Sequence, residues 1–249
     1  MEQDLDALVR RVDEDRWLAS RFAPEDARRR LVVLYALNYE IAHAVESVRT
    51  PALGDIRLAW WREALGEIHE GGPARSHPVL QRYALALQQT PFPLHRVEAL
   101  IAARARDLEP APFASAAQRE VYLDATAGNV MRLALAACGA DAGAHEDLVR
   151  EAALAWGGAG LLRAEPAWRA RGRRMLAAEG ETLMALSDRA RAAHNALRAM
   201  GKPPAHIFPA LGYVTLAPAY LKALERDRRD APLLMRQAKL IAAAATGRL

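Results

Sequence analysis

Apolar positions recur three and four residues apart along most of the chain, which is the spacing of one face of an α-helix. No segment shows a sustained apolar and polar alternation rich in β-branched residues, so we predict no sheet. Proline and glycine separate most of the periodic segments. The pattern predicts an all-α protein with helices over 24–48, 55–70, 78–89, 93–106, 115–138, 145–163, 179–200, 206–223 and 231–245.

The predicted helix over 24–48 has the clearest boundaries and the most apolar surface. Pro24 favours the first helical position, and Thr50-Pro51 marks the stop. Apolar residues occupy nearly all sides of this helix rather than one stripe, and such a helix is typical of a protein core. We therefore predict that the rest of the chain packs around it.

The 249 residues carry no Gly/Ser-rich or Pro-rich linker, so we predict a single domain over 1–249. Hydrophobic residues make up 52% of the chain and aromatics only 6%, a surplus that comes mainly from the helix formers alanine and leucine. The single cysteine, Cys138, excludes an intrachain disulfide and fits a reducing compartment.

The net charge of +4 comes almost entirely from arginine, because Lys202, Lys222 and Lys239 are the only lysines. The arginines are spread among acidic and apolar residues, without a basic stripe that contains aromatics, so we predict no nucleic-acid partner. Arginine-rich helices remain compatible with phosphate ligands.

The first 17 residues are acidic, which differs from a mitochondrial transit peptide and is too polar for a signal peptide. The longest apolar stretch, roughly Ile207 to Leu221, is short for a membrane span and contains Pro209 and Pro218. We predict a cytoplasmic protein that is able to contact a membrane surface peripherally.

Polar residues interrupt the predicted core helix at Asn38, Glu40, His43 and Glu46. Burying such groups costs free energy unless they are paired or used. Asn38, Ala42 and Glu46 are four residues apart and so share one edge of the helix. Glu40-x-x-His43 has the spacing of a di-iron half-site, but no second such pair occurs, and a histidine on a partly exposed face explains it better.

Several motifs along the chain together resemble the squalene/phytoene synthase family. The resemblance covers nearly the whole chain and rests on short segments, namely Asp15-Arg16-Trp17, Leu34-Tyr35-Ala36-Leu37, Trp60-Trp61-Arg62-Glu63, His77-Pro78-Val79, Asp107-Leu108, Tyr122-x-x-x-x-Ala127-Gly128, Leu161-Leu162-Arg163, Pro209-Ala210-Leu211 and Tyr220-Leu221. It implies a single-domain, isoprenoid-synthase-type helical bundle. It also implies enzymes that join two prenyl diphosphates head to head, with Mg²⁺ held by aspartate-rich motifs on facing helices.

The sequence departs from that family pattern at the two metal motifs. Ala42-His43-Ala44-Val45-Glu46 stands where the resemblance implies three aspartates, which leaves one carboxylate. Gly160 and Ala164 stand where the second motif has an asparagine and an aspartate. Because alanine and glycine have no side-chain donor, we expect no metal site and no cofactor, with Mg²⁺ required only if the chain is an active prenyltransferase.

Three functions fit these features. The residues around Glu46 and Trp60 resemble a branch of the family that includes an assembly factor of respiratory complex I, which favours a non-catalytic protein that binds a partner protein or an isoprenoid-like ligand. The alternatives are an active prenyl diphosphate transferase and a pure lipid or isoprenoid binder. We take Asn38, Glu46, Tyr122 and Arg163 as candidate binding residues, although each also has a structural explanation, such as a core hydrogen bond, aromatic packing or an ion pair.

Overall fold

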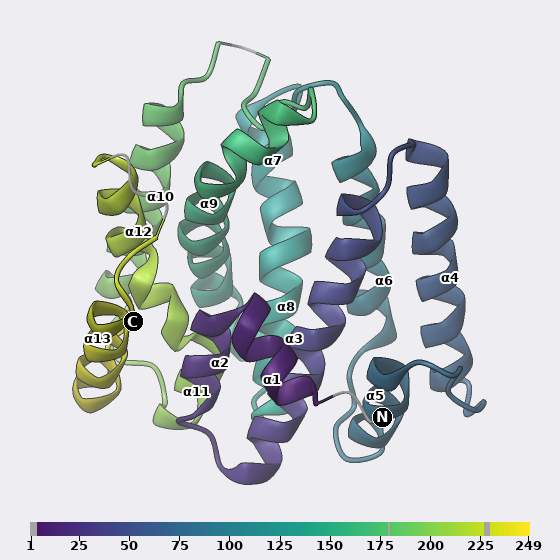
Figure 1. Cartoon of the computed structure of the whole chain (residues 1–249). Helices are drawn as coiled ribbons and strands as arrows, with labels where there is room; N and C mark the ends of the chain where they lie inside the picture. Colours follow the sequence, from purple (N-terminus) through teal and green to yellow (C-terminus); the bar gives the residue numbers. More distant parts are fainter. Residues whose placement is uncertain (1–3, 179, 227–229) are drawn as a thin grey trace.

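The computed structural model describes residues 4–178, 180–226 and 230–249. These residues form one helical domain, in which α3 (Glu25–Glu46) is the most buried long helix (Figure 1). Leu31, Leu34, Leu37 and Ile41 on this helix have no solvent exposure. The prediction of an all-round apolar core helix is confirmed, with Pro24 capping the helix rather than occupying its first turn.

The remaining helices surround α3. It contacts α1 (Leu5–Val12), α4 (Pro51–His69), α5 (Pro78–Leu87) and α8 (Asn129–Ala137). On the other side of α8 follow α9 (Glu146–Ala170) and α10 (Leu183–Ala199), which pack along each other. In Figure 1, α4 lies at one edge of the domain and α10, α12 (Ala217–Leu224) and α13 (Leu233–Thr246) lie at the opposite edge.

The prediction of an all-α protein is confirmed in the part of the chain that the structure describes. The only extended pairing there is an isolated bridge between Phe113 and Ala177. The predicted helix over 93–106 is α6 (Leu94–Arg104), followed by the 3-10 turn Ala105–Leu108. The helix predicted over 179–200 begins at Leu183. Residue 179 of this prediction lies outside the described residues, and so do residues 1–3 and 227–229 of the predicted domain.

Several helix predictions need correction. Two short helices, α1 and α2 (Glu14–Ser20), precede α3, where we predicted none. The second helix begins at Pro51, four residues early, because proline suits a first helical turn. The helix predicted over 145–163 continues through Pro166 to Ala170. The segment predicted as one helix over 206–223 consists of short pieces, Ala205–Ile207, α11 (Phe208–Leu211), Gly212–Leu216 and α12.

The helix predicted over 115–138 is interrupted at a place that bears on function. It comprises α7 (Ala116–Leu123), a π-helical turn (Asp124–Gly128) and α8. The Thr126 hydroxyl donates to the Tyr122 carbonyl at 2.7 Å, and the Asn129 amide donates to the Ala125 carbonyl at 3.0 Å. Such side-chain bonds satisfy carbonyls in the widened turn, and π-helical turns occur often at functional sites.

Among the described residues, one helical stretch, Ala205–Leu224, is long and apolar enough to cross a bilayer, with a mean hydropathy of 1.3. Within its most apolar 18-residue window, 78% is buried inside the domain. Packing in the protein core produces such burial, and it accounts for the apolar composition of this stretch.

Candidate functional site

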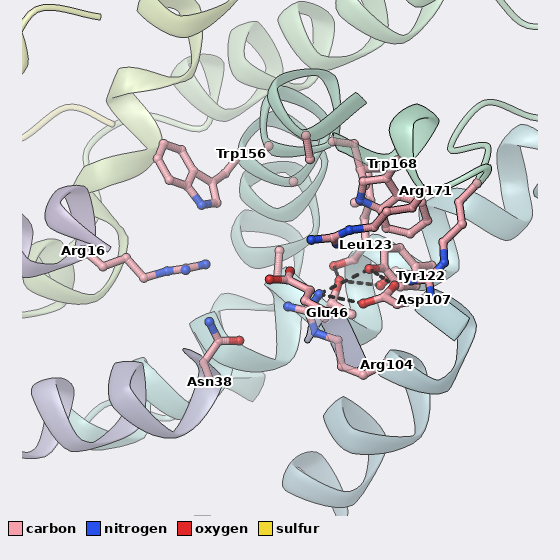
Figure 2. A pocket seen from close by; sticks show the side chains of 17 residues that line it. Arg16, Asn38, Glu46, Arg104, Asp107, Tyr122, Leu123, Trp156, Trp168 and Arg171 are labelled. Atoms are coloured by element: carbon pink, nitrogen blue, oxygen red, sulfur yellow. Dashed lines mark hydrogen bonds and ion pairs between the residues drawn. The ribbon is translucent and has the colours of Figure 1, made fainter. Parts of the chain in front are cut away.

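A cavity of about 180 Å³ lies between α3, α6, α7 and α9, next to the π-helical turn. Its polar lining separates into two groups (Figure 2). Arg16 and Asn38 stand on one side, near Trp156. Glu46, Arg104, Asp107, Tyr122 and Arg171 stand on the other side, and Arg173 also lines the cavity. The cavity thus combines α3, the predicted core helix, with elements distant in sequence.

Asn38 and Glu46 lie two helical turns apart on α3 and both line the cavity, as their spacing predicted. Asn38 is 8% exposed, and its amide has no hydrogen bond to any described residue although it points into the cavity (Figure 2). Because this amide opens on the cavity, it is available to a ligand or to water. Glu46 is exposed at the end of the helix.

Tyr122 belongs to a buried hydrogen-bonded triad with Asp107 and Arg104. The Tyr122 hydroxyl donates to Asp107 Oδ1 at 2.7 Å, and Arg104 Nη1 donates to Asp107 Oδ2 at 3.2 Å and to the Tyr122 oxygen at 3.3 Å. Burial, and then the Asp107 carboxylate, raise the pKa of Tyr122 well above its ordinary value. Burial opposes the charge of Arg104, but Tyr122 and Asp107 raise its pKa overall. Both oxygens of Asp107 are therefore engaged.

Arg16 closes the opposite side of the cavity. Its Nη1 donates to Asp13 at 2.7 Å, and its guanidinium lies 4.9 Å from the ring centre of Tyr213 and 5.7 Å from that of Tyr35. Although burial opposes the charge, the Asp13 carboxylate raises the pKa of Arg16. Trp156 packs on Tyr213 with ring centres 5.0 Å apart. Aromatic rings and this guanidinium thus occupy the interior beyond the cavity.

α9 lines the cavity with two tryptophans, Trp156 and Trp168, and with a row of smaller residues. Gly157, Gly160, Leu161 and Ala164 line it at spacings of three and four residues. A Cβ at Gly157 would lie 2.8 Å from Leu123 Cδ2, and one at Gly158 would lie 3.0 Å from Ala190 Cβ, so these two glycines allow close packing. Gly160 has open space beside it instead.

Arg163, the fourth candidate, does not line this cavity. Its guanidinium lies 4.0 Å from the ring centre of Tyr220, and its Nη2 donates to Asp230 at 2.6 Å. The structure thus brings together Asn38, Glu46 and Tyr122 and places Arg163 at the contact of α9 with α12 and the segment before α13. The sequence had suggested that Arg163 pairs with an acid, and the acid is Asp230.

Sequence reasoning missed most of the cationic lining. Arg104 is three residues before Asp107 at the end of α6, a spacing that puts both on one helical face, and this signal was available. Arg171 and Arg173 follow the end of α9, which was predicted seven residues too early. With Arg16 they give four arginines against the two carboxylates Glu46 and Asp107, so the lining is cationic.

These donors do not fit the Mg²⁺ cluster that the family resemblance implied. Mg²⁺ prefers an octahedron of oxygens, held by carboxylates and by the phosphates of a substrate. Asp107 is engaged by Tyr122 and Arg104, which leaves Glu46, while Gly160 and Ala164 on α9 contribute no donor. Within residues 4–178, 180–226 and 230–249, no group of three or more His, Cys, Asp or Glu side chains is placed to hold a metal ion.

The sequence profile of squalene/phytoene synthases matches residues 9–182 of this chain. The chain belongs to the squalene/phytoene synthase family. The matched region runs from α1 into the segment before α10 and contains every residue that lines the cavity.

Two solved structures share the fold of this family member. Squalene synthase HpnC from Alicyclobacillus acidocaldarius superimposes with a TM-score of 0.74 at 19% identity, covering 92% of this chain and 94% of that one. A dehydrosqualene synthase in complex with a ligand also gives a TM-score of 0.74, at 14% identity, covering 97% of this chain and 94% of that one. The isoprenoid-synthase-type bundle expected from the resemblance is thus the observed fold.

Part of this chain also matches curated proteins that are described as assembly factors. Complex I assembly factor 6 of Mus musculus is 25% identical over 132 residues, which is 53% of this chain and 39% of that protein. The Bos taurus protein of the same description is 24% identical over 128 residues, 51% of this chain and 38% of that protein. The match therefore spans well under half of these relatives.

Proposed function

We propose that this chain is a non-catalytic member of the squalene/phytoene synthase family that acts in the assembly of a respiratory complex by binding a partner protein or an isoprenoid-like ligand. The observation that carries this proposal is the donor set of the cavity. One carboxylate, Glu46, is free of buried partners, and the α9 positions across the cavity are Gly160 and Ala164.

Head-to-head condensation of two prenyl diphosphates requires the departure of two strongly anionic leaving groups. Hard cations neutralise such groups, and several carboxylates must hold those cations. A single free glutamate cannot hold such a cluster. The arginines are able to bind one phosphate group, but a guanidinium does not bridge leaving groups as a metal ion does.

The size of the cavity supports binding rather than condensation. Its volume of about 180 Å³ is below the ~300–1,000 Å³ typical of small-molecule sites, and two prenyl chains need more space than one such ligand. Arg16 and Trp156 line the side of the cavity away from Glu46. A short polar group of a ligand, next to the unpartnered amide of Asn38, fits better.

The assembly role rests on the similarity to complex I assembly factor 6. Because that similarity covers about half of this chain and 39% of the relative, both the partner and the process belong to the proposal. A cytoplasmic location with peripheral membrane contact is the expectation that accompanies it.

Turnover is the first test. Purified protein is incubated with farnesyl or geranylgeranyl diphosphate and Mg²⁺, beside a known squalene synthase, and extracts are analysed for C30 and C40 products. We expect none from this chain. Metal-dependent product that disappears in the Glu46→Gln variant would overturn the non-catalytic assignment.

Complex assembly is the second test. Deletion of the gene in the source organism should lower the amount of assembled complex I on native gels and NADH oxidation by its membranes. The wild-type chain and the Glu46→Ala variant should both restore it, because no metal chemistry is required. Normal complex I after deletion would contradict the assembly role.

An active prenyl diphosphate transferase is the second candidate, favoured by the cationic lining of the cavity. Arg104 and Arg171 stand on the side of Glu46, and together with Arg173 they could receive a diphosphate. The turnover test separates the two functions, since only this candidate predicts a product.

A further inference from the structure

The outward face of α13 is apolar along its whole length. Leu240 is the only buried side chain of this helix, whereas Leu234 is 80% exposed and Ile241 is 62% exposed. Ala238 and Ala245 are also exposed and continue the row at spacings of three and four residues. This row, 234/238/241/245, is the α13 stripe, and it lies at the outer edge of the domain (Figure 1).

A contiguous apolar row differs from the scattered exposed apolar residues that every protein surface has. Such patches, when rimmed by polar groups, mark interaction surfaces. Inside the domain, α13 covers the apolar turn Gly212–Leu216, so its inner side is already used. The stripe faces away from that contact and has no described residue over it.

Cations lie along one side of the α13 stripe. A groove of about 460 Å³ between α12 and α13 is lined by Lys222, Arg226 and Lys239. Lys239 also borders a neighbouring hollow with Arg198 and Arg248, and these two border a third hollow with Lys202. All three lysines of the chain therefore lie on one continuous surface.

These six cations make no ion pair with any described residue. One acid, Asp230, also lines the groove, but it pairs with Arg163, and the nearby Glu225 pairs with Arg191. α13 itself contains no acidic residue. The surface thus has an apolar row along α13 and positive charge along one side of that row.

We propose that this surface docks the protein on an anionic lipid bilayer, with the α13 stripe at the boundary of the acyl chains and the lysines and arginines at the lipid phosphates. Interfacial helices of this kind combine an apolar face with basic residues that reach anionic headgroups. The proposal deepens the peripheral membrane contact that accompanies the proposed function, by naming the surface that makes it, and it does not depend on the assembly role.

The composition of the surface favours a bilayer over a protein partner. A second copy of this chain would bring the same unpaired cations against one another, and like charges repel. Protein interfaces usually centre on tryptophan, tyrosine or arginine anchors in pockets, whereas the stripe offers leucine, isoleucine and alanine without an aromatic ring. The fluid boundary of a membrane needs no such anchor.

Vesicle flotation tests the proposal. The full chain is mixed with phosphatidylcholine vesicles that contain or lack 30% phosphatidylglycerol, about the anionic fraction needed for a strong surface potential. We expect binding only to the anionic vesicles, weakened by salt. Leu234→Glu/Ile241→Glu should abolish it, and Lys222→Gln/Lys239→Gln should weaken it by about 25-fold, at about fivefold per cation.

Val121→Glu is the matched control, because Val121 is 69% exposed on α7 and lies outside this surface. It should bind as the wild type does, and all variants should keep the circular dichroism and melting temperature of the wild type. Equal binding by Leu234→Glu/Ile241→Glu, or no binding to anionic vesicles by the wild type, would overturn the proposal. The proposal would also be overturned if the wild type formed a dimer in sedimentation experiments, bound no vesicles, and became monomeric in the Leu234→Glu/Ile241→Glu variant.

Discussion

The Tyr122 hydroxyl donates a 2.7 Å hydrogen bond to Asp107, and this bond connects α7 to the turn after α6 inside the cavity wall. The two residues are 15 positions apart and are 7% and 3% exposed. The bond explains why Asp107, an acid at the cavity, is not free to serve as a metal ligand.

Replacing Tyr122 with phenylalanine should destabilise the protein by about 1–3 kcal/mol, because a buried carboxylate oxygen loses its donor. Urea denaturation of the variant and the wild type measures the difference. Asp107→Ala should cost more, about 3 kcal/mol, since Arg104 would keep a largely buried charge without its carboxylate. If both variants had the same urea midpoint of unfolding as the wild type, the triad would contribute nothing to stability.

The fold could be predicted from local signals, and the cavity only in part. Helix α3 was recognisable because its apolar positions, Pro24 and Pro51 are all encoded within a short segment. Asn38 and Glu46 followed from spacing on that one helix. The neighbours of Arg163 could not be predicted, because the face of α9 that meets the cavity depends on how α9 packs against α10 and α12.

The same limit applies to the cationic lining. Arg16, Arg104 and Arg171 come from three elements far apart in sequence, and only tertiary packing brings them to one cavity. The π-helical turn beside Tyr122 is equally hidden, since the apolar pattern of residues 115–138 reads as one continuous helix.

Two glycines on α9 should respond differently to alanine. Gly160→Ala should stabilise the protein by about 0.5–1 kcal/mol, because the new methyl meets open space and alanine is the better helix former. Gly158→Ala brings a Cβ to 3.0 Å from Ala190 Cβ, so α10 must move.

Thermal and urea unfolding of both variants should place Gly158→Ala below Gly160→Ala by about 1–2 kcal/mol. The two substitutions are chemically identical and two residues apart, so each controls for the other. Equal stability of the two variants would show that α10 moves away from α9 without a loss of unfolding free energy.

The cationic lining should bind a diphosphate without a metal ion. Calorimetric titration with inorganic pyrophosphate in the presence of EDTA should show binding, and Arg171→Ala/Arg173→Ala should weaken it about tenfold, because charge-assisted hydrogen bonds at an open site are lost. Arg169→Ala is the control, since Arg169 is exposed on the same helix end and does not line the cavity. Binding that appears only with Mg²⁺ would argue for a metal site instead.

Acid should destabilise the protein through His194. This side chain of α10 is 8% exposed, and its Nδ1 has no partner. Burial, together with the positive charges of Arg198 and Lys239, lowers the pKa of His194 from 6.5 to about 4. Between these two values the unfolded chain binds a proton that the folded chain does not, so stability falls as the pH falls through this window.

Between pH 7.5 and pH 5 the loss attributable to His194 should be about 1–2 kcal/mol. It is measured as the difference between the wild type and His194→Gln in urea denaturation at each pH. The glutamine variant should lose less stability on acidification, because it has no group that titrates there. A loss equal to that of the wild type would assign the acid sensitivity to other groups, among them His69, whose pKa burial also lowers.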